Sequence, residues 1–186
     1  IPVFFKARDG KHLGANKAWE AYFGVERGSF IGKTVQELFS KAPEVAAKHQ
    51  AVDDELWRNP GTRSYELMVP VRDGSLRYTL NYKATFTGAD GKTAGLIGTI
   101  VDITERKRSE QSQAIEHRVM RVLAESDTLA AAMPGVLAAF CESLGLACGA
   151  RWSMDQKAGG FRCEESWSTD DAGVRAFLGA SRENTY

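Results

Sequence analysis

The chain has 186 residues, of which 43% are hydrophobic and 26% charged, and its 24 basic and 24 acidic side chains give a formal net charge of zero. This composition is typical of a soluble globular protein and excludes a disordered or fibrous chain, and the neutral total leaves no general attraction to nucleic acid or to anionic lipid. Because no apolar run approaches the ~18 residues of a membrane span and no signal peptide opens the chain, we expect a cytoplasmic protein.

Two short strands and a helix are expected at the start of the chain. Apolar runs at 2–5 and 13–15 lie on either side of a turn that ends at Gly10, which predicts a strand in each run. Asn16 is a favoured helix N-cap and Gly24 a favoured helix stop. We therefore expect a helix between these two residues.

A short and a long helix should follow. Thr34 and Glu37 have the spacing of a capping box, which predicts a short helix at that point. Pro43 suits the first turn of a longer helix, which should end near Asn59, before Pro-Gly. The expected apolar stripe of the long helix consists of Val45, His49, Val52 and Leu56. His49 thus takes an inward position.

From residue 63 the hydrophobic period changes to two. Segments 65–71, 76–86 and 94–101 read as three consecutive antiparallel strands, joined by turns at Gly74 and Gly91. Together with the earlier strands and helices, these elements predict an α+β domain of about a hundred residues.

Residues 105–126 carry five basic and four acidic side chains and contain neither glycine nor proline. This predicts one exposed helix, with a narrow apolar seam formed by Ile115, Val119 and Val122 at i, i+4 and i+7. We expect the seam to pair with a second copy in a homodimer. The alternative is a solvated linker helix.

Residues 127–186 predict a further helix, two strands and a last helix, at 127–145, 150–154, 161–167 and 171–178. The expected buried side of the first of these helices consists of Leu129, Met133, Val136, Leu137, Phe140 and Leu144. Four elements in sixty residues can form only a small core, so we expect these residues to be part of a second, truncated domain. The three cysteines of this region, Cys141, Cys148 and Cys163, match neither a zinc module nor a disulfide framework, and no metal site is expected.

Several strings resemble those of PAS sensory domains. The matching segments are 5–10 and 13–18 at the opening, 30–34 with its IGK turn, 65–66, 83–86 and 95–98 in the closing strands, and 102–107 at the exit. The exit string, Asp-Ile-Thr-Glu-Arg-Lys, is the most specific, and the resemblance covers residues 1–107. A weaker resemblance to the start of a GAF domain rests on 144–145, 151–152 and 163–167.

The resemblance implies a fold, a division of the chain into domains and a role in signalling. The fold would be a PAS fold at 1–104, with a five-stranded antiparallel sheet and flanking helices, followed by a signalling helix at 105–126 and the N-terminal part of a GAF-like domain at 127–186. The chain would be the signal-input fragment of a bacterial multidomain sensor. Its output domain, a GGDEF diguanylate cyclase or a histidine kinase, would lie outside this chain.

The chain itself is not expected to be an enzyme, because it contains no GxSxG, P-loop or HExxH motif. At the exit, the side chains of Asp102 and Thr104 can accept hydrogen bonds from backbone N–H groups where the last strand turns into the helix. We expect this junction to relay a signal from the sheet to the helix.

The strand at 76–86 has an apolar row and a polar row. The apolar row is Tyr78, Leu80 and Tyr82, and the polar row is Arg77, Thr79, Asn81 and Lys83. Ordinary patterning would bury the apolar row, whereas resemblance to flavin-binding PAS members turns Thr79, Asn81 and Lys83 toward a cavity. There they would face His49 and Tyr65 and form a site for a small organic anion such as a carboxylate. The alternative is a solvated sheet face and a half-exposed histidine.

Two cofactors and an empty pocket are the alternatives to that ligand. A light-sensing flavin adduct needs a cysteine, and residues 1–140 contain none. Haem is the stronger alternative, because haem-binding PAS domains take an axial histidine from the long helix, where His49 lies. A ligand-free PAS dimerisation module is the remaining possibility.

Overall fold

The structure of the protein, a computed structural model, describes residues 1–156 and 159–183. The chain divides into two compact units, Ile1–Lys107 and Arg108–Tyr186, each of which has its own sheet. Among the described residues, no helix has both the length and the apolar character needed to span a membrane.

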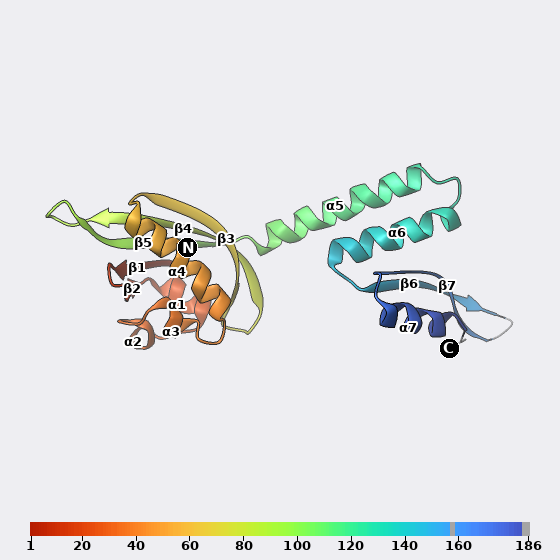
Figure 1. The fold of residues 1–186 in the computed structure, drawn as a ribbon, viewed down its shortest axis with the longest axis horizontal. Coiled ribbons are helices and arrows are strands. Elements are labelled where there is room, and N and C mark those ends of the chain that lie inside the picture. Colours follow the sequence, from red (N-terminus) through yellow and green to blue (C-terminus); the bar gives the residue numbers. More distant parts are fainter. Residues whose placement is uncertain (157–158, 184–186) are drawn as a thin grey trace. The chain divides into compact units, whose positions relative to one another are not determined.

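The first unit is a five-stranded antiparallel sheet with its helices over one face (Figure 1). The sheet order is β2-β1-β5-β4-β3. The strands are β1 (Val3–Ala7), β2 (His12–Ala15), β3 (Thr62–Pro70), β4 (Leu76–Thr87) and β5 (Thr93–Asp102). The helices between β2 and β3 are α1 (Lys17–Phe23), α2 (Arg27–Phe30), α3 (Val35–Leu38) and α4 (Pro43–Arg58). The predicted α+β class and the five-stranded sheet are confirmed.

The helix ends follow the predicted capping signals. The Asn16 side chain accepts a hydrogen bond from the Trp19 N–H, and Gly24 ends α1 in the left-handed conformation, with φ 66°. The capping box of α3 is formed in both directions: Thr34 N donates to the Glu37 carboxylate at 2.8 Å, and Glu37 N donates back to Thr34 Oγ1 at 3.4 Å.

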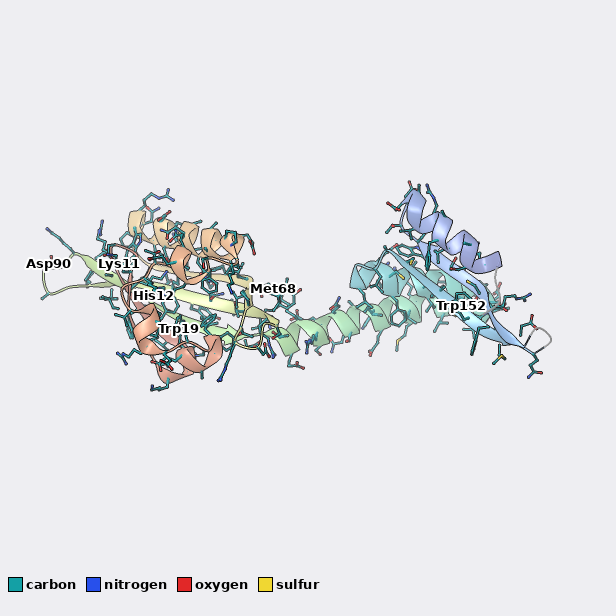
Figure 2. The ribbon with its side chains drawn as sticks, turned by 90° about the horizontal axis from the view of Figure 1, so that it is seen from below. Lys11, His12, Trp19, Met68, Asp90 and Trp152 are labelled. Carbon is teal, nitrogen blue, oxygen red and sulfur yellow. The ribbon has the colours of Figure 1, made fainter. Side chains whose placement is uncertain are left out.

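An aromatic cluster fills the part of the interior next to β1. Its buried members are Phe4, Ala15, Trp19, Phe30, Leu96 and Ile100. The ring of His12 lies 5.9 Å from that of Trp19, and both side chains lie inside the first unit, whereas Asp90 is at the tip of the β4–β5 turn (Figure 2). A cluster of this kind excludes water from the space between the sheet and α1.

Strand β4 turns its polar row inward. Thr79, Asn81 and Lys83 are 0%, 2% and 2% exposed, whereas Tyr78 and Tyr82 are 40% and 47% exposed. The arrangement that ordinary apolar patterning predicts is therefore wrong for this strand. The polar row lies inside because its partners lie on α4 and β1.

The junction between β5 and α5 (Thr104–Ala124) is held by backbone-to-side-chain bonds. Asp102 Oδ1 accepts from Thr104 N at 2.9 Å, and Thr104 Oγ1 accepts from Tyr78 N at 3.0 Å. The second oxygen of Asp102 accepts from the Tyr22 hydroxyl at 3.4 Å. Both predicted acceptors therefore act at the junction, and Thr104 bonds to the sheet.

The second unit continues α5 and adds two helices and a two-stranded sheet. These elements are α6 (Leu129–Leu144), β6 (Cys148–Asp155), β7 (Gly160–Ser168) and α7 (Ala172–Glu183). All four were expected from the sequence. The boundary between the two units lies after Lys107, so most of α5 belongs to the second unit.

The predicted buried side of α6 is wrong in part. Leu129, Phe140 and Leu144 are 68%, 43% and 48% exposed, whereas the buried residues of the helix are Ala132, Ala139 and Cys141. Small side chains allow α6 to approach its neighbours closely. A Cβ placed on Gly149 of β6, for example, would lie 2.6 Å from Cys141 Sγ.

The expected dimer seam of α5 lies partly against α6 of the same chain. Ile115 is 8% exposed, and Val119 and Val122 are half-buried. A Cβ placed on Gly135 would lie 2.8 Å from Val122 Cγ1, so α6 already covers the seam at that point. Arg118 also pairs with Glu142 of α6 at 2.5 Å.

Candidate ligand site in the buried polar core

Two buried lysines share one buried carboxylate at the centre of the first unit. Lys6 Nζ of β1 lies 2.6 Å from Asp53 Oδ2, and Lys83 Nζ of β4 lies 2.5 Å from Asp53 Oδ1. The three residues are 1%, 2% and 0% exposed, in the order Lys6, Lys83 and Asp53. This cluster, called the Lys-Asp-Lys cluster below, joins β1, α4 and β4.

The local pattern of each element brings these side chains together. Lys6 is two residues after the buried Phe4, on the same face of β1. Asp53 is four residues after His49 and three before Leu56, so it falls on the buried stripe of α4. Lys83 continues the inward row of β4.

A second pair of groups lies beside the cluster. Lys83 Nζ donates to the His49 carbonyl at 3.1 Å and lies 5.4 Å from the centre of the Tyr65 ring. The Tyr65 hydroxyl and His49 Nδ1 are 2.5 Å apart, at hydrogen-bonding distance. Burial, and then the charge of Asp53, raise the pKa of Tyr65, so its hydroxyl stays protonated.

The electrostatic environment leaves an excess of positive charge. Burial lowers the pKa of Lys83 to about 8, with Asp53 opposing that change. Burial alone would raise the pKa of Asp53, but the ammonium groups of Lys83 and Lys6 hold it below its ordinary value. One carboxylate therefore faces the amino groups of two lysines.

The two buried histidines do not add to this charge. Burial lowers the pKa of His49 to about 3 and that of His12 to about 4, and in each case a nearby lysine lowers it further. His12 Nδ1 donates to the Lys33 carbonyl at 2.9 Å, which fixes the proton of the neutral ring on that nitrogen. Its Nε2 is then an acceptor.

A small cavity of about 20 Å³ adjoins the cluster and is lined by Lys6, His12, His49 and Lys83 together with apolar and aromatic side chains, Trp19, Phe23 and Phe39 among them. This volume is about that of one water molecule. Organic ligands and haem occupy pockets of about 300–1,000 Å³. The residues around His49 therefore do not fit haem in this conformation, because aromatic side chains fill the space that a porphyrin needs.

The structure brings together only some of the five residues expected to bind a ligand. His49 and Lys83 line the cavity, and Tyr65 contacts His49. Thr79 and Asn81 are buried but bond to each other at 2.9 Å, and Thr79 also donates to the Leu67 carbonyl. These two side chains lie outside the cavity lining.

Sequence reasoning missed Lys6 and Asp53. Periodicity places both positions on a buried face, because Lys6 shares a strand face with Phe4 and Asp53 is one helical turn beyond His49. It does not show that the two side chains pair, and charged residues are mostly exposed, so the sequence carries no signal for the cluster. Within residues 1–156 and 159–183, no group of three histidine, cysteine or acidic side chains is placed to hold a metal ion.

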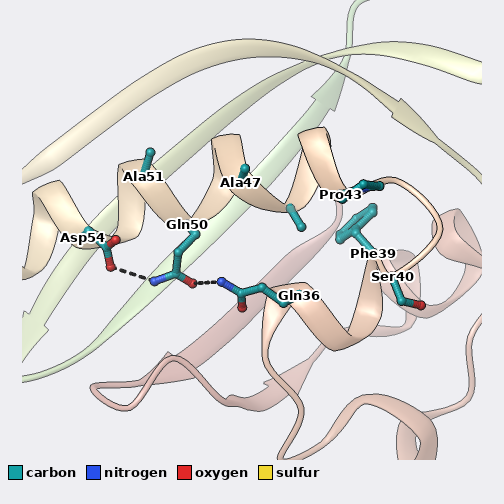
Figure 3. Close-up of a pocket in the computed structure, with 9 residues that line it drawn as sticks. Gln36, Phe39, Ser40, Pro43, Ala47, Gln50, Ala51 and Asp54 are labelled. Carbon is teal, nitrogen blue, oxygen red and sulfur yellow. Dashed lines mark hydrogen bonds between the residues drawn. The ribbon is translucent and has the colours of Figure 1, made fainter.

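A groove of about 480 Å³ lies on the outside of this unit, between α3 and α4 (Figure 3). Gln36 donates to Gln50 at 3.0 Å, and Gln50 donates to Asp54 at 2.7 Å, so the polar groups on this side bond to one another. Phe39 lines both this groove and the internal cavity. Its ring therefore lies between the cavity and the surface.

The PAS fold family matches residues 1–108, which is more than half of the chain. The chain therefore belongs to the PAS fold family. The match covers the whole first unit, including the exit into α5.

Curated relatives match over the same region. The aerobic respiration control sensor protein ArcB of Escherichia coli K12 is 30% identical over 110 residues, which are 59% of this chain and 14% of ArcB. The cyclic di-GMP phosphodiesterase PdeR of the same organism is 26% identical over 114 residues, 61% of this chain and 16% of PdeR. The chain thus spans about a seventh of the length of these relatives.

Among solved structures, the Vibrio cholerae VqmA dimer is similar, with a TM-score of 0.51 and 24% identity over 56% of this chain and 47% of that one. This likeness is one of fold. The PAS unit of the present chain is therefore similar to a region of the sensor protein ArcB.

Proposed function

We propose that the chain is a signal-input fragment whose PAS unit detects a small organic anion and relays its binding through α5. The observation that carries the proposal is the Lys-Asp-Lys cluster, in which two buried ammonium groups share one carboxylate. A buried excess charge is unfavourable unless it is compensated. An anion in the cavity would compensate it.

The expected ligand class is a carboxylate. A ligand carboxylate has the same charge and the same hydrogen-bonding capacity as the side chain of Asp53, so the two would compete for Lys6 and Lys83. The cavity of about 20 Å³ must widen to admit it. Movement of Phe39 is one route, since its ring lines both the cavity and the groove outside.

A second function is favoured by the small volume of that cavity. If the cluster is a fixed structural element, the PAS unit works without a ligand, as a dimerising relay. The output domain in either case would be carried by a longer protein, as a kinase or as a cyclic-dinucleotide enzyme, in line with the relatives ArcB and PdeR.

The relay would begin at the β5–α5 junction. Asp102 and Thr104 tie the first residues of α5 to Tyr22 of α1 and to the backbone of β4. A change in α1 or in the sheet would therefore move the start of the helix. Glu66 of β3 adds ion pairs to Arg106 at 3.0 Å and to Lys107 at 2.6 Å.

The ligand proposal is tested by native mass spectrometry of the purified chain against its denatured mass, followed by titration with acetate, butyrate and benzoate. We expect a bound organic acid or a measurable affinity for at least one probe, and loss of that affinity in Lys83→Met. Lys48→Met, which removes an exposed lysine of α4, is the control. A bare mass together with no affinity for any probe would favour the ligand-free relay.

Asp53→Asn distinguishes competition from simple loss of folding. Since Asp53 occupies the lysines in the free protein, its replacement by a neutral side chain should increase affinity for the carboxylate probes by about tenfold or more. Unchanged or weaker binding by a folded Asp53→Asn variant would contradict a ligand that competes for the two lysines.

The homodimer expected from the sequence stays a prediction. Pairing through Ile115, Val119 and Val122 requires α6 to leave Val122. Sedimentation equilibrium of Ile115→Asp tests it: the dissociation constant should rise if the seam joins two copies. An unchanged constant would exclude this seam.

A further inference from the structure

A second groove of the PAS unit, separate from the polar core, has the size and charge of a ligand site. Its volume is about 540 Å³, within the range of about 300–1,000 Å³ that small-molecule sites occupy. It lies between the end of α1, the connection from α3 to α4, and the turn from β3 to β4. The outer side of the aromatic wall, formed by Trp19, Phe23 and Phe39, is its apolar floor.

The aromatic wall separates this groove from the polar core. The same three rings line the internal cavity on their other side. They contact one another, with ring centres 4.9 Å apart for Trp19 and Phe23 and 5.8 Å for Phe23 and Phe39. A ligand in the groove would therefore touch the wall without entering the polar core.

The groove is positively charged. Lys41 and Arg72 line it, and no acidic residue does. Both side chains are exposed, and neither forms an ion pair with any residue in the described part of the chain. The nearby Asp73 is already engaged, because its carboxylate accepts from Ser75 N at 2.9 Å and lies 3.7 Å from Arg77.

Arg72 is held in place by the end of α1. The backbone N–H of Arg72 donates to the Tyr22 carbonyl at 3.3 Å. A Cβ on Gly24 would lie 2.4 Å from Arg72 Cγ, so the aliphatic part of Arg72 packs over the bare backbone of the α1 C-cap. This packing restrains the Cβ, Cγ and Cδ atoms of Arg72 at the edge of the groove.

The groove adjoins the start of the signalling helix through α1. Tyr22, whose carbonyl bonds to Arg72, donates its hydroxyl to Asp102 at 3.4 Å. Asp102 in turn accepts from Thr104 N at the first residue of α5. An occupant that moves Arg72 or the end of α1 thus acts on the exit junction.

We propose that this groove binds a small organic anion with an aromatic or branched apolar body, whose charge is met by Lys41 and Arg72 and whose body lies on Trp19, Phe23 and Phe39. The site is independent of the Lys-Asp-Lys cluster. Its occupant is coupled to α5 through Tyr22 and Asp102.

The test compares two probes of similar shape, naphthaleneacetate and the neutral naphthaleneacetamide. Each is titrated into the whole chain while the backbone N–H signals are followed by NMR. We expect shifts at Trp19, Phe23, Phe39 and Arg72, with the acid binding about fivefold tighter than the amide. Lys41→Gln/Arg72→Gln should remove that difference and leave the amide unaffected. Lys48→Gln/Lys92→Gln, which removes the same charge from exposed positions elsewhere, should retain it.

Other outcomes overturn the proposal. Equal affinity for acid and amide in the natural protein would show that the two cations play no part. Shifts centred on the polar core and abolished by Lys83→Met would assign the probe to the other site. The coupling is tested by Tyr22→Phe, which should keep the affinity and remove the probe-dependent shifts at Asp102 and Thr104; retained shifts would contradict this route.

Discussion

In the first unit, charged side chains lie inside the fold with aromatic rings around them, whereas the buried residues of the second unit are mostly apolar or small, Ile115, Ala132 and Ala139 among them. Lys6 and Asp53 are 1% and 0% exposed, and Leu129 and Phe177 are 68% and 63% exposed. The difference teaches that burial follows the available partners. A charge is buried where an opposite charge meets it, and a large apolar residue stays exposed where no described element covers it.

Among the changes that would test this comparison, substitution of Asp53 is expected to have the largest effect on stability. Asp53→Ala leaves two buried ammonium groups without their carboxylate, which should lower the free energy of unfolding of the first unit by about 3–5 kcal/mol. Urea denaturation, followed by the near-ultraviolet signal of Trp19 and its neighbours, measures it. The transition of the second unit should not change.

A matched variant separates lost charge pairing from lost packing. Lys6→Met/Asp53→Leu/Lys83→Met replaces the whole cluster with apolar side chains of similar volume, and it should recover most of the stability lost in Asp53→Ala. If the triple variant is as unstable as Asp53→Ala, packing around Asp53 and not its charge is the main contribution.

The next largest difference between the two units is expected in how their stability depends on acidic pH. The pKa of His12 is lowered to about 4 and that of His49 to about 3, against 6.5 for a free histidine, so both rings protonate more readily in the unfolded chain. The stability due to the neutral rings is complete above pH ~6.5 and falls as pH decreases toward the folded pKa values, by about 2 kcal/mol per histidine at pH ~5. Denaturation curves between pH ~7 and ~5 measure this loss.

Substitution of each buried histidine provides the control. His12→Asn and His49→Asn should each flatten the acid dependence of the first transition. A first unit that keeps its full stability at pH ~5 would contradict burial of the two neutral rings.

A smaller effect sharpens the comparison through one threonine in each unit. Thr104→Val removes the side-chain acceptor of the Tyr78 N–H and should destabilise the first unit by about 1 kcal/mol. Thr128→Ala removes the N-cap of α6, whose side chain accepts from Ala131 N, and should cost the second unit about 1 kcal/mol. Thermal denaturation should show each variant lowering a different transition, and a shared shift would mean that the two units unfold together.

Local signals were enough to predict most of the first unit from the sequence. Asn16, Gly24 and the Thr34–Glu37 capping box act through neighbours within a few residues, so their geometry is set locally. The three closing strands are marked by their period of two. These features required no knowledge of tertiary contacts.

The partners of the polar core could not be predicted in this way. Asp53 is 47 residues from Lys6 and 30 from Lys83 in the sequence, and no local pattern connects them. The same limit explains the error on α6, where Ala132 and Ala139 are buried in place of Leu129 and Phe140. Which face of a helix is covered depends on how closely its neighbours approach, and that depends on side chains elsewhere in the chain.

Phe39 lines the internal cavity, the groove between α3 and α4, and the groove beside Arg72. It is the one residue common to these three linings, so a rotation of its ring would change the boundary of each space. Exchange of water between the interior and the surface should therefore proceed at the rate of a side-chain motion, without any need for α4 to detach from the sheet. The tightly paired centre of the domain would then be stable against unfolding and still in rapid contact with the solvent.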